Sequence, residues 1–363
     1  MSYLGNKDYR HGSVASTGIL LVNLGTPEAP TAAAVRRYLG EFLSDPRVVE
    51  IPRPLWWLIL HLFVLPLRPR KSAAAYAKVW MPEGSPLFVH SNRLSLDVAQ
   101  KLQDEHQNLV VKLAMRYGKP AIKEVLDEMR EKSMQRLLIL PLFPQYSATT
   151  TASVFDEVAR ILRTWRWQPE LRYISHYHKQ PLYISACAEQ IRSFRNQHGR
   201  GDLLFFSFHG LPKRNLLEGD PYHCQCHATA RLIAQALSLN EQEYRLCFQS
   251  QFGRAEWLKP YTEQTLGELA KQDVKTIDVF CPGFSADCLE TLEEIAIRGR
   301  EVFVEAGGSE LRYIPALNNS KLHIESIKNL ILRNIENWGV EDIEDEQIRQ
   351  QATEKALTMG ARQ

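Results

Sequence analysis

Short apolar runs alternate with amphipathic stretches along most of this chain. In six of these runs the apolar residues follow one another without alternation, which is typical of parallel strands covered on both faces. We therefore predict strands at residues 18–24, 109–115, 136–140, 203–208, 245–248 and 276–280. The stretches between them have helical periodicity and predict helices at residues 31–42, 92–103, 122–131, 152–163, 228–237 and 263–271. The repeated strand–helix–strand order predicts a doubly wound α/β fold.

The first series of strands ends near residues 175–180, and we divide the chain there. Residues 18–175 are expected to form one lobe and residues 176–320 a second lobe of similar design, with a cleft between them. A closing helix at residues 321–338 is expected to return to the first lobe. Residues 339–363 are acidic and then polar, which predicts a frayed or surface-bound tail.

The longest apolar run, residues 55–67, falls short of the roughly 20 residues that span a bilayer. It contains two tryptophans and is followed by three basic residues within 68–71, a pattern typical of a segment in a membrane interface. On that interpretation Trp57 and Leu60 contact lipid. A buried core helix is the alternative that the pattern leaves open.

The amino-acid composition of the chain limits the classes of function to be considered. There are 44 Lys and Arg against 42 Asp and Glu, a net charge of +2, so no charge excess indicates a nucleic-acid partner. With 44% hydrophobic and 24% charged residues, the chain has the composition of an ordinary globular protein. Six scattered cysteines and no signal peptide favour a reduced, cytoplasmic compartment.

Candidate chemistry lies where the predicted strands end, because ligands of open α/β sheets bind beyond the carboxyl ends of the strands. His209 follows the strand at 203–208, and Gly210 and Pro212 shape the turn after it. A histidine there can act as a base near neutral pH or bind a metal ion. A structural histidine at the strand end is the alternative.

Acidic residues follow the strand at 276–280. Asp287 and Glu290 are three residues apart and fit a capping box that opens a helix. Glu290 and Glu294 are four apart and would share a helix face, where like charges repel. A cation passing between them would remove that repulsion, so a capping role and a cation-binding role both stay open for Glu290.

Two thiols and two imidazoles lie within residues 223–227. Such donors can hold zinc or an iron–sulfur centre. A Cys-x-Cys sequence with no second pair nearby is a weak signal, however. We therefore expect Cys224 and Cys226 to be reduced thiols, with a bound [2Fe–2S] centre as the less favoured alternative.

Six segments taken together resemble the ferrochelatase family, in order along the chain. They lie at residues 20–27, 144–147, 206–212, 219–222, 247–253 and 282–295. The His-Gly-Leu-Pro sequence at 209–212 and the Asp-Cys-Leu-Glu-Thr-Leu sequence at 287–292 are the most specific. The resemblance implies two Rossmann-like lobes with parallel sheets and an active-site cleft, as in class II chelatases. It also implies a lyase of the bacterial protoporphyrin type, which inserts Fe(II) into protoporphyrin IX to give protohaem and two protons, the last step of haem biosynthesis.

The resemblance assigns roles to residues of this chain. His209 and Glu290 match the family's catalytic pair and its iron-binding groups. A tight apolar cleft can bend the macrocycle, a neutral histidine can accept pyrrole protons, and a carboxylate suits a ferrous ion. Which of the two takes protons and which delivers iron stays open. The candidate porphyrin-binding residues are Asn23, Leu24, Arg116, Tyr117, Trp257 and Phe284.

Four departures from the family pattern bear on the expected chemistry. Cys288 stands where many members have His, and Arg298 where many have a further acidic residue, so a three-ligand metal site is in doubt. Leu24 replaces the Tyr of coproporphyrin-type relatives, which favours protoporphyrin as the substrate. The tail contains no cysteine, unlike the cluster-bearing extension of animal members.

The resemblance also implies partners and a location. The expected partners are protoporphyrin IX, ferrous iron, a membrane surface that residues 55–67 contact, and the preceding oxidase of the pathway. No organic cofactor and no nucleic acid is expected, and the protein is expected in the cytoplasm, peripherally attached to the inner membrane. The alternatives are a non-catalytic tetrapyrrole or metal carrier and a coproporphyrin- or cobalt-type chelatase. A carrier needs no base beside a carboxylate, and cobalt-type substrates need no membrane.

Overall fold

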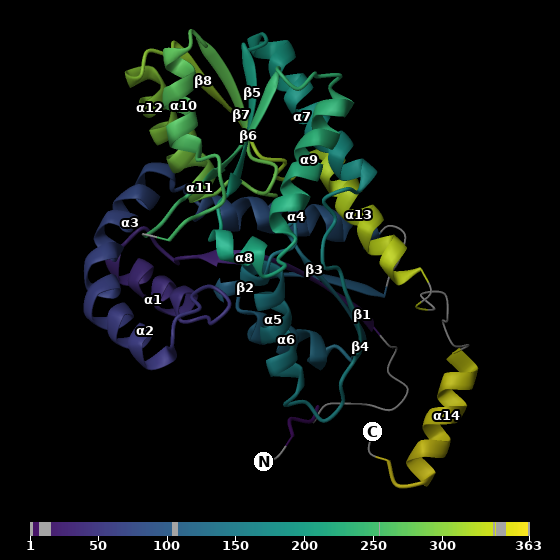
Figure 1. The fold of residues 1–363 in the computed structure, drawn as a ribbon. Coiled ribbons are helices and arrows are strands. Elements are labelled where there is room, and N and C mark those ends of the chain that lie inside the picture. The colour runs from purple at the N-terminus through teal and green to yellow at the C-terminus, as the bar shows by residue number, and fades with distance from the viewer. Residues whose placement is uncertain are drawn as a thin grey trace.

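The computed structural model describes residues 3–6, 16–103, 108–253, 255–336, 338 and 346–361. Two parallel four-stranded sheets form the centres of two lobes (Figure 1). The first has the order β2-β1-β3-β4 and the second β6-β5-β7-β8, which confirms the predicted fold class. The strands are β1 (Ser16–Thr26), β2 (Leu109–Gly118), β3 (Met134–Pro141), β4 (Glu170–Tyr173), β5 (Leu203–His209), β6 (Tyr244–Gln249), β7 (Thr276–Phe280) and β8 (Glu310–Ile314).

The six strands predicted from continuous apolar runs are all present, whereas β4 and β8 were missed. Both missed strands lie at a sheet edge, and both contain the sequence Glu-Leu-Arg-Tyr. The Glu and Arg residues in each of these short strands interrupt the apolar pattern, so the strands lack the continuous run that the prediction required.

Helices cover both sheets, and the six that the sequence predicted are present. In the first lobe they are α1 (Ala32–Leu43), α2 (Arg53–Ile59), α3 (Leu65–Val79), α4 (Pro86–Gln103), α5 (Ile122–Glu131) and α6 (Ser153–Leu162). In the second they are α7 (Pro181–His198), α8 (Lys213–Leu217), α9 (Tyr222–Ala236), α10 (Thr262–Lys271), α11 (Leu289–Thr291) and α12 (Arg300–Glu305). Three π-helical segments are inserted: η1 (Leu60–Val64), η2 (Ala148–Ala152) and η3 (Leu292–Gly299). Such segments often lie at functional sites.

Helix α13 (Lys321–Ile335) returns from the second lobe and packs against α7 and α4 (Figure 1). Ile327 and Ile331 on this helix are fully buried in one apolar cluster that contains residues of both sheets, among them Leu140 and Phe206. The two lobes therefore share a core on this side. Within the predicted tail, residues 339–345 lie outside the described part, and Glu346–Thr358 form α14.

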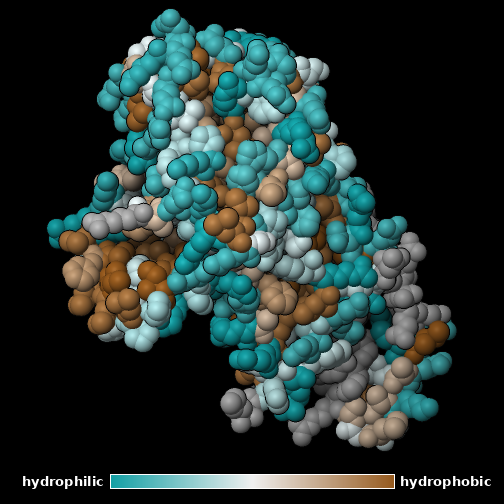
Figure 2. Space-filling view, viewed as in Figure 1, coloured by the Kyte–Doolittle hydropathy of each residue, from teal (hydrophilic) through white to brown (hydrophobic). Residues whose placement is uncertain are grey.

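The apolar run at residues 55–67 is divided between α2, η1 and the start of α3, and it has two faces. Trp56, Leu60 and Leu65 are buried against α1. The opposite face, which we call the lip, is exposed and consists of Leu55, Trp57, Leu58, Leu62, Phe63 and Leu67. Figure 2 shows apolar side chains gathered over the α2–α3 region. The expectation that Leu60 contacts lipid is wrong, because its side chain is 2% exposed. No helix in the described ranges is both long and apolar enough to cross a bilayer.

Candidate active site

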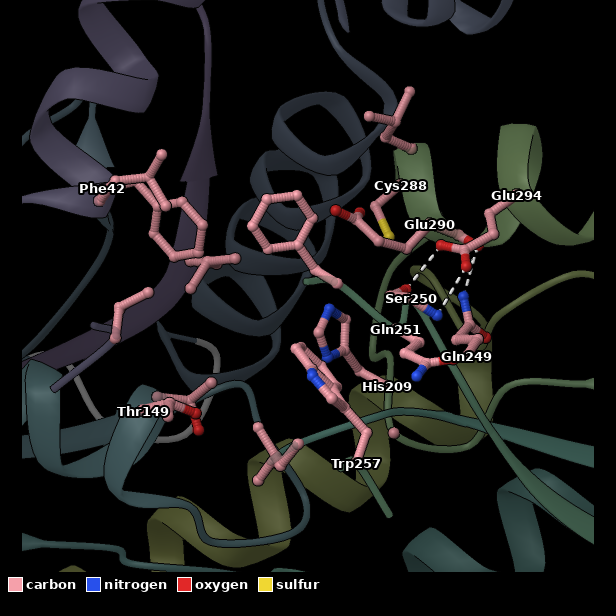
Figure 3. A pocket seen from close by; sticks show the side chains of 18 of the residues that line it. Phe42, Thr149, His209, Gln249, Ser250, Gln251, Trp257, Cys288, Glu290 and Glu294 are labelled. Carbon is pink, nitrogen blue, oxygen red and sulfur yellow. Dashed lines mark hydrogen bonds between the residues drawn. The ribbon is translucent and has the colours of Figure 1, made fainter. Parts of the chain in front are cut away.

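A cavity of about 1820 Å³ lies between the lobes and is walled by both of them. The first lobe contributes the end of β1, part of α1 and the lip helices, and the second contributes the ends of β5 and β6 and the start of α11. The volume exceeds the 300–1,000 Å³ or so typical of small-ligand pockets, so the cavity suits a large apolar molecule. Figure 3 shows His209 and Glu290 pointing into it, with Trp257 beside His209.

His209 is the last residue of β5, at the carboxyl edge of the second sheet. Its Nδ1 atom lies 2.6 Å from the carbonyl oxygen of Gly210, and its ring centroid lies 6.4 Å from that of Trp257. A carbonyl oxygen can only accept a hydrogen bond, so Nδ1 must carry the proton. The neutral ring therefore keeps its lone pair on Nε2, which is the atom able to accept a proton.

Asp287 and Glu290 do not form the capping box that their spacing suggested. The helix α11 begins one residue later, with Cys288 at the N-cap position, and the Thr291 hydroxyl accepts the Cys288 N–H at 3.0 Å. Among the described residues, no hydrogen bond fixes the Glu290 carboxylate other than its contact with the Cys288 thiol. The carboxylate is therefore available to the cavity.

Asp287 has a structural role instead. It is 4% exposed and accepts hydrogen bonds from Asn318 at 2.7 Å, from Thr291 at 3.1 Å and from the Ala316 amide at 3.2 Å. The Tyr313 hydroxyl donates a further bond to it. This buried carboxylate holds the β7–α11 connection against the β8–α13 connection, and it thereby fixes the start of α11.

Glu294 lies behind Glu290, in the π-helix η3. The Ser250 amide and hydroxyl donate to its two carboxylate oxygens at 2.7 and 2.6 Å, and Arg298 pairs with it at 3.2 Å. Burial raises the pKa of Glu294 above its usual range, against the lowering effects of Ser250, His209 and Arg298, and the charge on Glu290 raises it further. The two glutamates thus influence each other, as predicted, but Glu294 is directed to Ser250 and Arg298.

The comparisons of sequence with known proteins agree on one family. The sequence model of the Ferrochelatase family matches residues 16–335. Similar curated proteins named ferrochelatase include those of Nitrosococcus oceani, 51% identical over 368 residues, and Thioalkalivibrio sulfidiphilus, 53% identical over 368 residues. Each of these alignments covers 100% of both chains. The ferrochelatase of Nitrosomonas europaea is 49% identical, with 98% of each chain covered.

This chain belongs to the ferrochelatase family. Ferrochelatases are enzymes, and their class is lyase, as the sequence predicted.

Two solved structures resemble the fold. One is CbiX, the terminal enzyme for biosynthesis of sirohaem in denitrifying bacteria, with 13% identity, a TM-score of 0.47 and coverage of 87% of this chain and 98% of that one. The other is the sirohydrochlorin chelatase SirB in complex with cobalt, from Bacillus subtilis subspecies spizizenii, with 11% identity, a TM-score of 0.48 and coverage of 89% and 96%.

The ferrochelatase cavity contains most of the residues that the sequence predicted for it. His209, Glu290, Asn23, Leu24, Trp257 and Phe284 all line it. Asn23 is itself nearly buried and donates to the Ser91 hydroxyl at 2.9 Å, so its amide is already satisfied on the first-lobe side. The Trp257 Nε1 atom is buried and has no partner among the described residues. It is a hydrogen-bond donor that a bound molecule could use.

Arg116 and Tyr117 do not line the cavity, in contrast to the prediction. Arg116 pairs with Asp45 at 2.5 Å, and the fully buried Tyr117 donates to the same carboxylate at 2.8 Å. Burial raises the pKa of Asp45, but hydrogen bonds led by that from Ser153 lower it below its usual range, so it is an anion. The edge of Phe42, which does line the cavity, packs on the Tyr117 ring at 5.1 Å. The Arg–Tyr pair therefore supports the cavity wall from behind.

The cysteine cluster does not form a metal site. Helix α9 places Cys224 at the surface and Cys226 in the core, because residues two apart on a helix point in nearly opposite directions. The His223 and His227 rings lie 4.5 Å apart on another face of the helix. Within the part of the chain that the structure describes, no group of three or more His, Cys, Asp or Glu residues could hold a metal ion. These observations give no support to a [2Fe–2S] centre.

The departures at Cys288 and Arg298 have visible consequences. The Cys288 thiol is 4% exposed, and burial raises its pKa well above the usual range, so it is a neutral thiol beside Glu290. Arg298 bridges Glu294 and Glu263, at 3.2 and 3.1 Å. Arg298 therefore neutralises part of the acidic charge of Glu294 and Glu263, at a position where many family members have a further acidic residue.

Sequence reasoning missed two groups of cavity residues. Arg68 and Lys71 line the mouth, although the sequence assigned this basic cluster to lipid alone. Arg68 lies over the Phe252 ring at 4.3 Å, and no carboxylate of the described ranges forms a salt bridge with Arg68 or Lys71. Gln249 and Ser250 lie within the family-like segment at residues 247–253, but neither residue type by itself indicates chemistry.

Proposed function

We propose that this chain inserts ferrous iron into protoporphyrin IX, and that His209 and Glu290 are the groups that carry out the insertion. The observation that supports this most directly is their placement. Strands β5 and β7 are neighbours in the sheet, so a base at the end of one and a free carboxylate after the other meet at the same wall of an apolar cavity.

His209 is proposed to accept the pyrrole protons. The reaction forms bonds between iron and the four ring nitrogens and releases two N–H protons. Nε2 of the neutral ring is a suitable acceptor near neutral pH, because the Gly210 carbonyl holds the proton on Nδ1. Glu290 is proposed to bind the incoming ferrous ion, since a carboxylate oxygen is a suitable ligand for it. The buried Cys288 thiol nearby is neutral, so the Glu290 carboxylate supplies the negative charge.

The cavity mouth is proposed to recognise the two carboxylates of protoporphyrin IX. Arg68 and Lys71 are cations at this mouth, and neither has a carboxylate partner among the residues that the structure describes, so they match two propionate groups. Leu24 and Phe42 present apolar surface to the rest of the macrocycle. A coproporphyrin carries four carboxylates, two of which would have to enter this apolar part of the cavity unpaired.

Attachment of the protein to the inner membrane, at its cytoplasmic face, is proposed to occur through the lip. Its exposed apolar side chains adjoin the mouth of the cavity, where Phe63 and Leu67 belong to both. A poorly soluble porphyrin could then pass between the membrane, or a preceding oxidase bound to it, and the cavity without crossing water.

An anaerobic assay with ferrous iron and protoporphyrin IX tests the proposed function. Loss of porphyrin fluorescence and growth of the haem absorbance band are expected with the wild-type chain, and coproporphyrin should react more slowly. Tight porphyrin binding with no turnover would contradict the proposal and favour a carrier. Faster turnover of coproporphyrin would contradict the proposed substrate alone.

A further inference from the structure

Gln249 connects the two halves of the catalytic pair. It is the last residue of β6, is 3% exposed, and stands directly opposite His209 in the β5–β6 register. Its backbone carbonyl accepts the Gly210 amide at 2.8 Å, and its side-chain Nε2 donates to the backbone carbonyl of Glu290 at 2.8 Å. Strand β6 and strand β7, which leads to α11, lie on opposite sides of β5 in the sheet, so strand pairing does not join Gln249 to Glu290.

The orientation of the Gln249 amide is fixed by its partners. The Glu290 carbonyl can only accept, so the amide nitrogen must face it. The amide oxygen then accepts from the Ser207 hydroxyl at 2.7 Å, and Ser207 in turn lies 3.0 Å from the Thr262 hydroxyl. The Gln249, Ser207 and Thr262 side chains are buried, so water does not compete for the hydrogen bonds among them. Figure 3 shows Gln249 and Ser250 next to each other, below Glu290 and Glu294.

The position of this contact matters because of where Glu290 lies. It belongs to the three-residue helix α11, and the π-helix η3 starts two residues later. Where a helix changes from α to π, the backbone hydrogen-bond pattern changes as well, so the main chain alone defines the orientation of Glu290 poorly. An external donor on its carbonyl removes that freedom.

We propose that Gln249 is a positioning residue, which sets the placement of the Glu290 carboxylate relative to the His209 ring. This inference rests on the proposed function, because it takes Glu290 to be an iron-binding group. It predicts that loss of the amide slows iron insertion while porphyrin binding is retained, because the contact is made with the Glu290 backbone and not with the macrocycle.

The test replaces Gln249 in two ways. Gln249→Met keeps the length of the side chain but cannot donate, and it should lower kcat at least about tenfold with KM for protoporphyrin changed less than about twofold. Gln249→Glu can donate only in its protonated form, so its kcat relative to wild type should recover as pH falls. Unchanged kcat in both variants, or an equal loss at every pH in both, would overturn the proposal.

Two further variants distinguish a positioning role of Gln249 from a general loss of structure. Cys247→Ala alters a fully buried side chain two residues earlier on β6, outside the cavity lining, and should lower the melting temperature without lowering kcat. The double variant Gln249→Met/Glu290→Gln should be no slower than Glu290→Gln alone, because Gln249 acts through Glu290. Additive losses would overturn the inference, whereas wild-type turnover in Glu290→Gln would instead overturn the proposed role of Glu290.

Discussion

A substitution of Glu290 distinguishes the capping role from the cation-binding role that the sequence left open for this residue. The structure assigns the helix cap to Cys288 and Thr291, so the Glu290 carboxylate has no capping duty to lose. We predict that Glu290→Gln keeps the melting temperature within a degree or two of wild type, while turnover falls by roughly two orders of magnitude or more. Thermal melting and single-turnover assays on the same preparation measure both. A lower melting temperature with normal turnover would return Glu290 to a structural role.

His209 gives a complementary prediction. Removing a general base typically costs about 10²–10⁴-fold in rate, so His209→Ala should lose turnover on that scale. Porphyrin affinity should change little, because Trp257, Phe284 and the apolar wall remain. Titration of protoporphyrin by fluorescence measures the affinity. Loss of binding and of turnover in equal proportion would make His209 a binding group only.

At the scale of residues, the sequence predicted candidate site residues that directly follow a strand. The pattern made His209 and Glu290 candidates because the carboxyl ends of neighbouring parallel strands meet at one edge of a sheet, and only the resemblance to the family assigned them a catalytic role. The position of Arg116 could not be found that way. Its partner Asp45 is 71 residues earlier in the chain, and only the packed fold shows that the two form a buried pair behind the cavity wall.

At the scale of elements, the lip gives the clearest prediction. Trp57 and Phe63 are 58% and 61% exposed, whereas their neighbours Trp56 and Leu60 are buried. Trp57→Ser with Phe63→Ser should reduce co-sedimentation with anionic vesicles several-fold and leave thermal stability unchanged.

The matched control for the lip is Trp56→Ala. The indole of Trp56 donates to the Leu43 carbonyl and is buried, so this variant should lose about 3–5 kcal/mol of unfolding free energy. Any folded fraction should still bind vesicles. Unchanged binding after loss of the two exposed side chains would exclude the lip as the attachment surface.

Elements were predicted unevenly, for a physical reason. A central strand such as β1 contains a continuous apolar run, residues 19–22, because it is buried on both faces, and this run predicts a strand. The edge strands β4 and β8 are short and mixed, and their pairing depends on the neighbouring strand. The π-helical segments could not be predicted either, since an inserted residue does not change which residue types form a helix.

At the scale of the whole molecule, two histidines near the lobe junction predict an acid-sensitive fold. Burial lowers the pKa of His178 and of His323 to about 4 from the ordinary 6.5. Both therefore bind protons more readily in the unfolded chain, so stability is full above about pH 6.5 and is lost as pH falls towards 4. Each contributes at most about 1.4 kcal/mol per pH unit in that window.

Denaturant unfolding at several pH values between 4 and 7 measures this slope. His178→Asn and His323→Asn should each flatten it by about one proton, even if the variants are less stable at neutral pH. An identical pH slope in wild type and in both variants would show that other groups cause the acid sensitivity.

The apolar cluster shared by β3, β5 and α13 bears on the ancestry and dissection of this protein. Two sheets of the same strand order, each ending in an edge strand with the sequence Glu-Leu-Arg-Tyr, have the form expected of a duplicated ancestral half. The two halves share part of their core, however. Ile327 and Ile331 fill a space bounded by both sheets, so a fragment cut near residue 175 would expose apolar surface that its missing counterpart covers. Each half would then depend on the other for solubility. Replacing one half by the corresponding half of a relative would also require matching changes in the shared apolar cluster.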